Sequence, residues 1–291
     1  MSLYRTEAGA LLIAQRYQEF LKFWPQPNRQ FHVPTRYGDT FVVTCGADDS
    51  PPLLLLHGAG SNSAMWIADA AACSTRYKLC AIDMIGEPGF SAESRPPMRS
   101  DAYALWLDDV LQGLRIDRFS MVGISLGGWL ALDYATRRPA RVERLVLIVP
   151  AGIGRQRWSM LFKILPLLLL GDWGRKKALQ IVIGPESADS TEGRQPYRDF
   201  MVLVQRHFRA RMERIPVLTD AVLQQLKMPL LAILGGQDVI LDSAETKQRL
   251  ERNVPHAEIR YLPEQGHGVL GERDTILEFL SSLDKQSGAR G

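Results

Sequence analysis

Six short runs, most of them continuously apolar, recur along the chain. Runs of this kind are typical of strands that are covered on both faces of a sheet. The six are PPLLLLHGAG (51–60), YKLCAIDMIG (77–86), FSMVGIS (119–125), RLVLIVPAG (144–152), PLLAILGGQD (229–238) and AEIRYLPEQGH (257–267). The segment FHVPTRYGDTFVVTCG (31–46) precedes them and predicts two further strands joined by a turn at Gly38-Asp39.

Segments with apolar residues at helical spacing lie between several of these runs. They cover 102–114, 126–138 and 275–283. Another helix is predicted near the N-terminus, where one face would carry Ile13, Tyr17, Phe20, Leu21 and Trp24. Buried strands that alternate with helices predict an α/β fold, in which a mostly parallel sheet is flanked by helices on both sides.

One stretch, residues 153–219, breaks this alternation, because it shows helical patterns and no convincing strand. We predict that it is a helical lid (cap), inserted over the crevice in which parallel sheets bind ligands. The expected organisation is an N-terminal helix packing on the core (1–30), a core made of 31–152 and 220–291, and the lid (153–219). An apolar face of the lid is expected to seal it against the core, with binding of an acyl chain or docking to a membrane surface as the alternatives. Its residues are Met160, Leu161, Phe162, Leu165 and 167–170.

The composition is that of an ordinary globular protein, with 46% hydrophobic and 23% charged residues in a chain of 291. The 35 Lys and Arg residues exceed the 32 Asp and Glu residues by only three, so no nucleic-acid partner is expected. The charge is nevertheless uneven: 12 − 6 = +6 for residues 153–219, and therefore −3 for the remainder. The positive lid fits either a solvated surface or a surface that attracts anionic substrates.

The features that bear on location favour the cytoplasm. The apolar stretch near the N-terminus is broken by Gln15 and Arg16 and is too short for a secretory signal. The run 161–170 is too short to span a bilayer, so no stable membrane association is expected. Three cysteines without CxxC spacing argue against a disulfide framework or a zinc site and favour a reducing compartment.

The sequence GISLGG (123–128) lies between a predicted strand and a predicted helix. G-x-S-x-G in this context is the nucleophile elbow, a sharp turn that places the serine hydroxyl above the sheet. Side chains at the flanking positions would collide with the neighbouring strand and helix, which explains Gly123 and Gly127. The N-terminal end of the following helix favours a developing oxyanion. Ser125 is therefore the candidate nucleophile, and an ordinary glycine-rich turn is the alternative.

A serine nucleophile needs a general base, and the chain has five histidines. His267 is the candidate, because it lies late in the chain, in a glycine-flanked loop at the carboxyl end of the last core run. The other four lie in an early strand, at the end of the first core run, within the predicted lid and in a surface connection; they are His32, His57, His207 and His256.

The base in turn needs an acid that fixes its tautomer and stabilises the imidazolium. Asp238 closes the fifth run, at the carboxyl end of a strand, and is the candidate. Asp242, four residues later, is the competitor. The order Ser125, Asp238, His267 is the chain order expected of this elbow.

A tetrahedral intermediate needs two amide donors for its oxyanion. The first should be the backbone N–H of Leu126, the residue after the nucleophile. The second should come from the loop HGAG (57–60), where the N–H of Ala59 is the candidate. His57 is expected to brace this loop through hydrogen bonds, and Asp83, which ends the second run, is expected to have a similar structural role.

Together these motifs resemble the α/β-hydrolase family. The resemblance extends from Phe31 to Leu283 and rests on HGAG near Ala59, DMIGEPGFS from Asp83, GISLGG around Ser125, GGQD before Val239 and GH at His267. The N-terminal helix followed by FHVPTRYGDTFVV also resembles a bacterial carboxylesterase subgroup. One loop departs from the family pattern D-x-x-G-x-G-x-S, because Glu87-Pro88 places the next glycine one residue late.

The resemblance implies an eight-stranded, mostly parallel sheet with a helical lid after the sixth strand, and chemistry that needs no metal or organic cofactor. The expected activity is hydrolysis of a small, fairly apolar carboxylic ester through an acyl-enzyme intermediate. Carbon–carbon bond hydrolases, lactonases and cofactor-free perhydrolases of the family keep the same triad, and some members are ligand receptors, so these remain alternatives. Trp66 and Trp129 are candidate substrate contacts, with a plain core role as the alternative.

Overall fold

The structure is a computed structural model that describes residues 2–157, 159–184, 195–269 and 271–282. Eight strands form one sheet in the order β1-β2-β4-β3-β5-β6-β7-β8; the pairs β1–β2 and β2–β4 are antiparallel and all others are parallel. The strands are β1 (Asn28–Val33), β2 (Thr40–Cys45), β3 (Pro52–Leu56), β4 (Lys78–Ile82), β5 (Phe119–Ile124), β6 (Val142–Ile148), β7 (Leu230–Gly235) and β8 (Glu258–Leu262). The predicted mostly parallel α/β fold is confirmed.

Burial explains why the central strands read as continuous apolar runs. Every residue of β2 and of β7 is buried, because helices cover both faces of the sheet. In β3, Leu54 and Leu56 belong to one core layer, whereas Leu53 and Leu55 belong to the other. The edge strands β1 and β8 are only partly covered, so they tolerate more polar residues.

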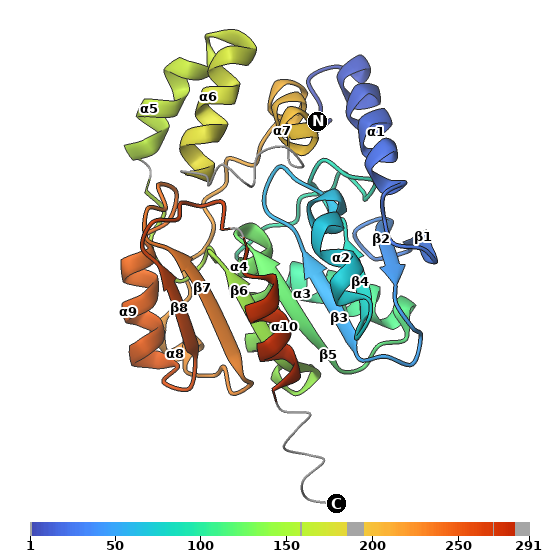
Figure 1. The fold of residues 1–291 in the computed structure, drawn as a ribbon, viewed down its shortest axis with the longest axis vertical. Coiled ribbons are helices and arrows are strands. Elements are labelled where there is room, and N and C mark those ends of the chain that lie inside the picture. The colour runs from blue at the N-terminus through green and yellow to red at the C-terminus, as the bar shows by residue number, and fades with distance from the viewer. Residues whose placement is uncertain (1, 158, 185–194, 270, 283–291) are drawn as a thin grey trace, which may run out of the picture.

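Helices pack on both faces of the sheet (Figure 1). One core layer contains α3 (Ala102–Leu114), α4 (Leu126–Arg137), α8 (Asp220–Leu223) and α9 (Ser243–Asn253), and the other contains α1 (Glu7–Leu21), α2 (Ile67–Cys73) and α10 (Arg273–Ser281). Short 3₁₀ turns, Ser63–Trp66 and Pro139–Arg141, precede α2 and β6. Thr6 is the N-cap of helix α1, and its hydroxyl accepts the Gly9 N–H; the helix buries Ile13, Tyr17 and Leu21, as their spacing predicts.

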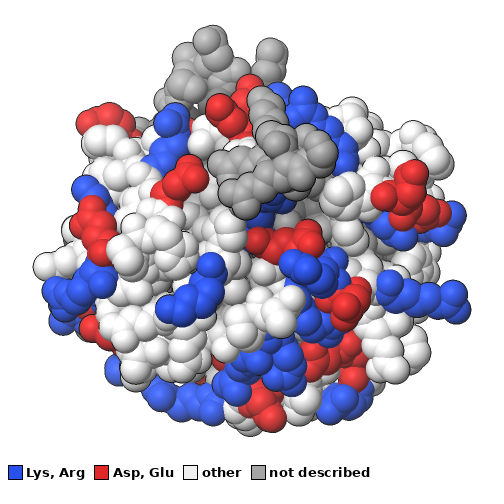
Figure 2. All heavy atoms as spheres, turned by 90° about the horizontal axis from the view of Figure 1, so that it is seen from below, with Lys and Arg blue, Asp and Glu red and all other residues white. Residues whose placement is uncertain are grey.

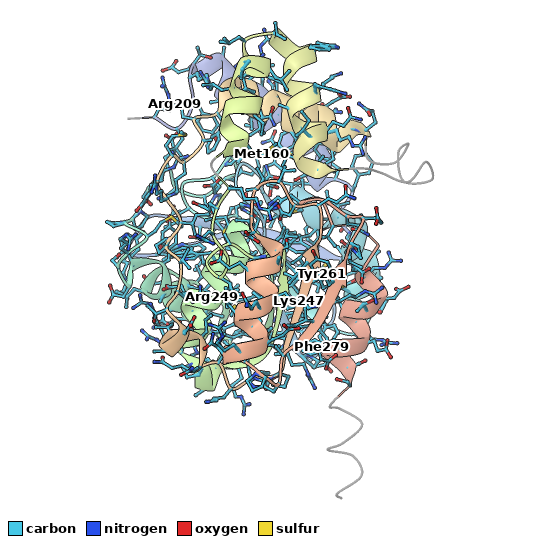
Figure 3. The ribbon with its side chains drawn as sticks, turned by 90° about the vertical axis from the view of Figure 1, so that its left-hand side faces the viewer. Met160, Arg209, Lys247, Arg249, Tyr261 and Phe279 are labelled. Atoms are coloured by element: carbon cyan, nitrogen blue, oxygen red, sulfur yellow. The ribbon has the colours of Figure 1, made fainter. Side chains whose placement is uncertain are left out.

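Three helices, α5 (Ser159–Leu168), α6 (Gly171–Ile183) and α7 (Gln195–His207), follow β6 and lie above the carboxyl ends of the parallel strands (Figure 1). We call residues 153–219, to which they belong, the insert. Its two ends meet, since the Leu218 N–H donates to the Gly152 carbonyl at 2.8 Å. Arg249 on α9, below the insert in Figure 3, donates to the carbonyls of Ile153 and Leu218 and pairs with Asp220.

We expect Arg249→Met to lower the free energy of unfolding by about 2 kcal/mol, because it removes charge-assisted hydrogen bonds to the carbonyls of both ends of the insert. Urea unfolding followed by circular dichroism measures this loss. The matched control is Arg252→Met, on the same helix, because Arg252 is exposed to solvent. Equal losses for the two variants would show that the hydrogen bonds from Arg249 to the ends of the insert make no specific contribution to stability.

Part of the apolar stretch of the insert faces solvent instead of sealing the insert against the core. Leu165, Leu169 and Leu170 are 63%, 85% and 57% exposed, so the predicted sealing role is wrong for these three residues. The side chains of Leu161 and Phe162 lie outside the described part of the structure. Met160 lies at the end of α5 that faces the core (Figure 3).

Two surface properties bear on the expected partners. Among the described residues, no helix combines the length and the apolar character needed to cross a bilayer. The end of the molecule away from the insert carries Lys and Arg side chains interspersed with Asp and Glu (Figure 2).

Candidate active site

Ser125 occupies the sharp turn between β5 and α4. Its backbone has φ 52° and ψ −108°, a conformation that side-chain-bearing residues rarely adopt. Backbone hydrogen bonds hold it there: the Ser125 N–H donates to the Ile148 carbonyl at 3.0 Å, and the Ser125 carbonyl accepts the N–H groups of Trp129 and Ala151. The strained turn predicted from the motif is therefore present, anchored to β6 and to the first turn of α4.

The two flanking glycines are required by close backbone contacts. A Cβ atom at Gly123 would lie 2.4 Å from the Gly127 carbonyl oxygen, and one at Gly127 would lie 2.2 Å from the Leu56 carbonyl oxygen. Both obstacles are main-chain atoms, which cannot rotate away as a side chain can. The elbow therefore accepts only glycine at these positions, as the motif predicts.

Accordingly, Gly127→Ala should lower the free energy of unfolding by about 3 kcal/mol, through overpacking of α4 against β3. Chemical denaturation of the purified variant provides the measurement. Gly58→Ala is the control, because a Cβ there would meet the Ser125 Cβ at an ordinary 3.7 Å. If Gly127→Ala were as stable as Gly58→Ala, the close-contact explanation of the elbow would be wrong.

His267 lies in the loop that follows β8 and reaches Ser125. Its Nε2 is 3.0 Å from the Ser125 Oγ, and its Nδ1 is 2.7 Å from the Asp238 Oδ2. The insert helps to hold this loop, since the N–H groups of His267 and Gly268 donate to the carbonyls of Val182 and Ile183 at the end of α6. The structure thus joins the three predicted residues in one chain of hydrogen bonds.

Asp238 is fixed on both of its carboxylate oxygens. Oδ1 accepts the N–H groups of Ile240 and Leu241 at 2.7 and 2.9 Å, and Oδ2 faces His267. The residue is 1% exposed, so the orientation of its charge toward the imidazole is rigid and poorly screened by solvent. This is the arrangement that a carboxylate needs in order to select a histidine tautomer.

The competing carboxylate, Asp242, has a different role. Its Oδ1 accepts the Glu245 N–H at 3.0 Å, which makes it the N-cap of α9, and it lies 3.4 Å from the Arg157 guanidinium. The hydrogen bond from Glu245 and the charge of Arg157 lower the pKa of this carboxyl. Asp242 therefore caps a helix and pairs with the insert, whereas Asp238 contacts the histidine.

The loop that carries Ala59 lies beside Ser125, as the 3.7 Å approach of a Gly58 Cβ to the Ser125 Cβ shows. Leu126 is the first residue of α4, so its N–H has no partner within the helix. The structure therefore brings both predicted oxyanion donors to the neighbourhood of the candidate nucleophile. Ala59 itself is exposed to solvent.

His57 and Asp83 have the structural surroundings predicted for them. His57 is fully buried; its Nδ1 lies 2.8 Å from the Gly58 carbonyl and its Nε2 lies 2.9 Å from the Met84 nitrogen, so the Nδ1–H tautomer satisfies both contacts. Burial lowers the pKa of His57, which favours this neutral form. Asp83 accepts hydrogen bonds from the Tyr17 hydroxyl and from Ser63.

Trp66 and Trp129 lie in the hydrophobic core, in opposite layers of the molecule. They are only 4% and 2% exposed, and Trp129 packs edge-on against Tyr103 with ring centroids 5.6 Å apart. These surroundings agree with the core alternative, and the role as substrate contacts stays a prediction.

One contact next to the candidate site does not follow from the motifs. The Glu87 carboxylate accepts the N–H of Gly60, the residue after Ala59, at 2.7 Å. The only signal in the sequence is the extra residue in the Glu87-Pro88 loop, which marks an unusual path without indicating what the path contacts.

The arrangement of fold and site is that of a known family. The family model of the alpha/beta hydrolase family matches residues 53–278, which include Ser125, Asp238 and His267. The chain belongs to the α/β-hydrolase family.

Comparison with individual proteins narrows the class. The chain is 31% identical over 270 residues to an uncharacterized carboxylesterase, nap, of Bacillus subtilis (90% of this chain, 88% of that protein). It is 30% identical over 273 residues to carboxylesterase YbfK of the same organism (92% and 90%). The crystal structure of carboxylesterase CesB (YbfK) superposes with a TM-score of 0.83 and 26% identity, covering 94% of this chain and 99% of that one. The protein is a carboxylesterase-like hydrolase.

Proposed function

We propose that the protein is a serine hydrolase that cleaves a small, fairly apolar carboxylic ester through an acyl-enzyme intermediate. The observation that carries this proposal is the continuous chain Ser125 Oγ–His267–Asp238, with contacts of 3.0 and 2.7 Å. The carboxylesterases of Bacillus subtilis, to which most of the chain is similar, support an ester as the substrate.

The first half of the reaction acylates the serine. The Ser125 oxygen attacks the ester carbonyl while His267 Nε2 takes the proton of the Ser125 hydroxyl. The tetrahedral oxyanion that forms accepts hydrogen bonds from the N–H groups of Leu126 and Ala59. The imidazolium that forms is stabilised by the adjacent Asp238 carboxylate. It then gives its proton to the alkoxide, and the alcohol leaves.

The second half releases the acid. A water molecule takes the place of the alcohol, His267 removes one of its protons, and the resulting hydroxide attacks the acyl carbonyl. Collapse of the second tetrahedral intermediate frees the carboxylic acid and returns the proton to Ser125. Every proton in the cycle passes through His267 Nε2, which explains why its other nitrogen must be held by a fixed acceptor.

The test is a series of p-nitrophenyl esters from acetate to decanoate. We expect turnover with a maximum at short or medium acyl chains. Release of p-nitrophenol should show an initial burst equal to the enzyme concentration when deacylation is slow. Typical enzymes exceed about ten turnovers per day by orders of magnitude. A rate below about ten turnovers per day on every ester would therefore contradict the esterase proposal. It would favour a carbon–carbon bond hydrolase, a lactonase, a perhydrolase or a ligand receptor.

A further inference from the structure

Glu87 is a buried carboxyl group that the proposed reaction leaves without a role. It lies in the loop between β4 and α3 and is 3% exposed. Its Oε2 accepts the Gly60 N–H at 2.7 Å. Its Oε1 is buried and has no hydrogen-bond partner among the described residues. Burying a carboxyl group with one oxygen unpaired is unfavourable, so this arrangement calls for an explanation.

The contact belongs to a set of bonds that join two loops. The Asn62 side-chain amide donates to the Pro88 carbonyl at 2.8 Å, and the Met84 N–H donates to His57 Nε2 at 2.9 Å. These bonds hold the loop after β3 on both sides of its tip, and Glu87 holds the tip itself. Gly60, where φ is +66°, faces open space: apart from Gly60 and its two chain neighbours, no atom of the described residues lies within 4 Å of the point that a Cβ would occupy. Packing on that side therefore does little to fix the tip.

We propose that Glu87 is a positioning residue for the oxyanion hole: its carboxylate holds the Gly60 N–H and thereby fixes the Ala59 N–H toward the carbonyl that Ser125 attacks. The inference rests on the proposed function, because it assigns Glu87 to the stabilisation of a tetrahedral oxyanion. The extra residue of the Glu87-Pro88 loop then has a purpose, since this loop brings a carboxylate to the peptide that follows the donor N–H of Ala59.

Burial and the groups around Glu87 act on its ionisation in opposite directions. Burial raises the pKa of Glu87 from the ordinary 4.5 to about 7, against the opposing effects of the Gly60 N–H and the Arg95 and Arg211 guanidinium groups. The phenols nearby, Tyr103 on α3 and Tyr4 near the N-terminus, have pKa values raised to about 12 by burial. The two tyrosines therefore stay neutral between pH 5 and 9, whereas Glu87 changes its charge within this range.

Stability and loop fixation should respond to this ionisation in opposite directions. The carboxyl has a higher pKa in the folded state than the ordinary value, so folding favours its neutral form. The free energy of unfolding should therefore fall as the pH rises from about 4.5 to about 7. A carboxylate is a stronger acceptor for an N–H group than a neutral carboxyl, so the Gly60 tip is held best above this range.

The first experiment compares Glu87→Gln with wild type at pH 8. We expect kcat to fall by about tenfold or more while KM changes by less than about threefold, because the loss falls on the transition state. The Ki of a trifluoromethyl ketone, which forms an oxyanion on Ser125, should rise by the same factor. The melting temperature should stay at or above that of wild type, which separates positioning from a merely structural role.

Glu93→Gln is the matched control, because Glu93 lies in the same loop but is exposed and accepts the Leu3 N–H instead. It should leave kcat, KM and Ki unchanged. Wild-type values of kcat and Ki in Glu87→Gln would overturn the inference while leaving the esterase proposal intact. Absence of esterase activity from wild type itself would instead refute the proposed function.

The second experiment needs no variant and decides the matter if Glu87→Gln does not fold. Near pH 7, where Glu87 changes its charge, log kcat/KM of wild type should fall through a step of about one unit, in addition to the decline that protonation of a general base causes, because neutral Glu87 should leave about the residual activity of Glu87→Gln. A wild-type profile that a single ionisation describes would overturn the inference. Where Glu87→Gln folds, its own profile should lack this step, and a step of the same size in that variant would equally overturn the inference.

Discussion

Replacing Ser125 by alanine is expected to lower kcat by about 10⁵- to 10⁶-fold, the loss found when a serine nucleophile is removed from a hydrogen-bonded triad. The structure gives the reason: the Ser125 Oγ ends the hydrogen-bonded chain Ser125–His267–Asp238, and His267 Nε2 lies 3.0 Å from it, in position to take its proton. The measurement is initial-rate hydrolysis of p-nitrophenyl butyrate.

The same variant should resist a fluorophosphonate probe, which labels activated serines covalently. Ser120→Ala is the matched control, because Ser120 is a buried serine on β5, the strand that leads into the elbow. It should be labelled at the wild-type rate. Labelling of Ser125→Ala as strong as that of wild type would show that the nucleophile lies elsewhere.

The second large effect is expected for the acid. Asp238→Asn should lower kcat by about 10³- to 10⁴-fold, because the asparagine amide can present a donor to His267 Nδ1 and favour the wrong tautomer. Asp242→Asn should change kcat by less than about threefold, since Asp242 caps α9 and pairs with Arg157. The expected cost of that variant is a modest loss of stability.

Steady-state kinetics of the two variants, with unfolding curves for both, separates these effects. The substitutions are chemically identical and only four residues apart, so each is the control for the other. Equal losses of kcat would mean that the contact between Asp238 and His267 is not the one the reaction uses. A larger loss of kcat in Asp242→Asn would mean that Asp242, and not Asp238, is the carboxylate that assists the histidine.

The strands could be predicted because burial on both faces leaves a plain signal. Leu53 to Leu56 fill both core layers in turn, so no polar residue interrupts them. Helix α9 gives a weaker signal, since its sequence SAETKQRLERN buries Leu250 as its one large apolar side chain. The role of the leucines in the insert could not be predicted, because exposed and sealed apolar faces look identical in sequence; Leu169 is 85% exposed.

The candidate site likewise contains residues that the sequence predicts and one contact that it does not. Ser125 was predictable because two glycines with main-chain contacts at 2.4 and 2.2 Å impose a local pattern, G-x-S-x-G. His267 and Asp238 were predictable from chain order and from their places after strands. The contact of Glu87 with Gly60 joins residues 27 positions apart through a loop whose path departs from the family pattern, so no local pattern indicates it.

The central claim is that Ser125 carries the acyl group, and rapid acid quenching of wild type mixed with a p-nitrophenyl ester tests it most directly. Digestion and mass spectrometry of the quenched protein should find one added acyl group, on the peptide that contains Ser125, and none in Ser125→Ala. Steady hydrolysis with the acyl group on another residue, or undiminished hydrolysis by Ser125→Ala, would contradict the account.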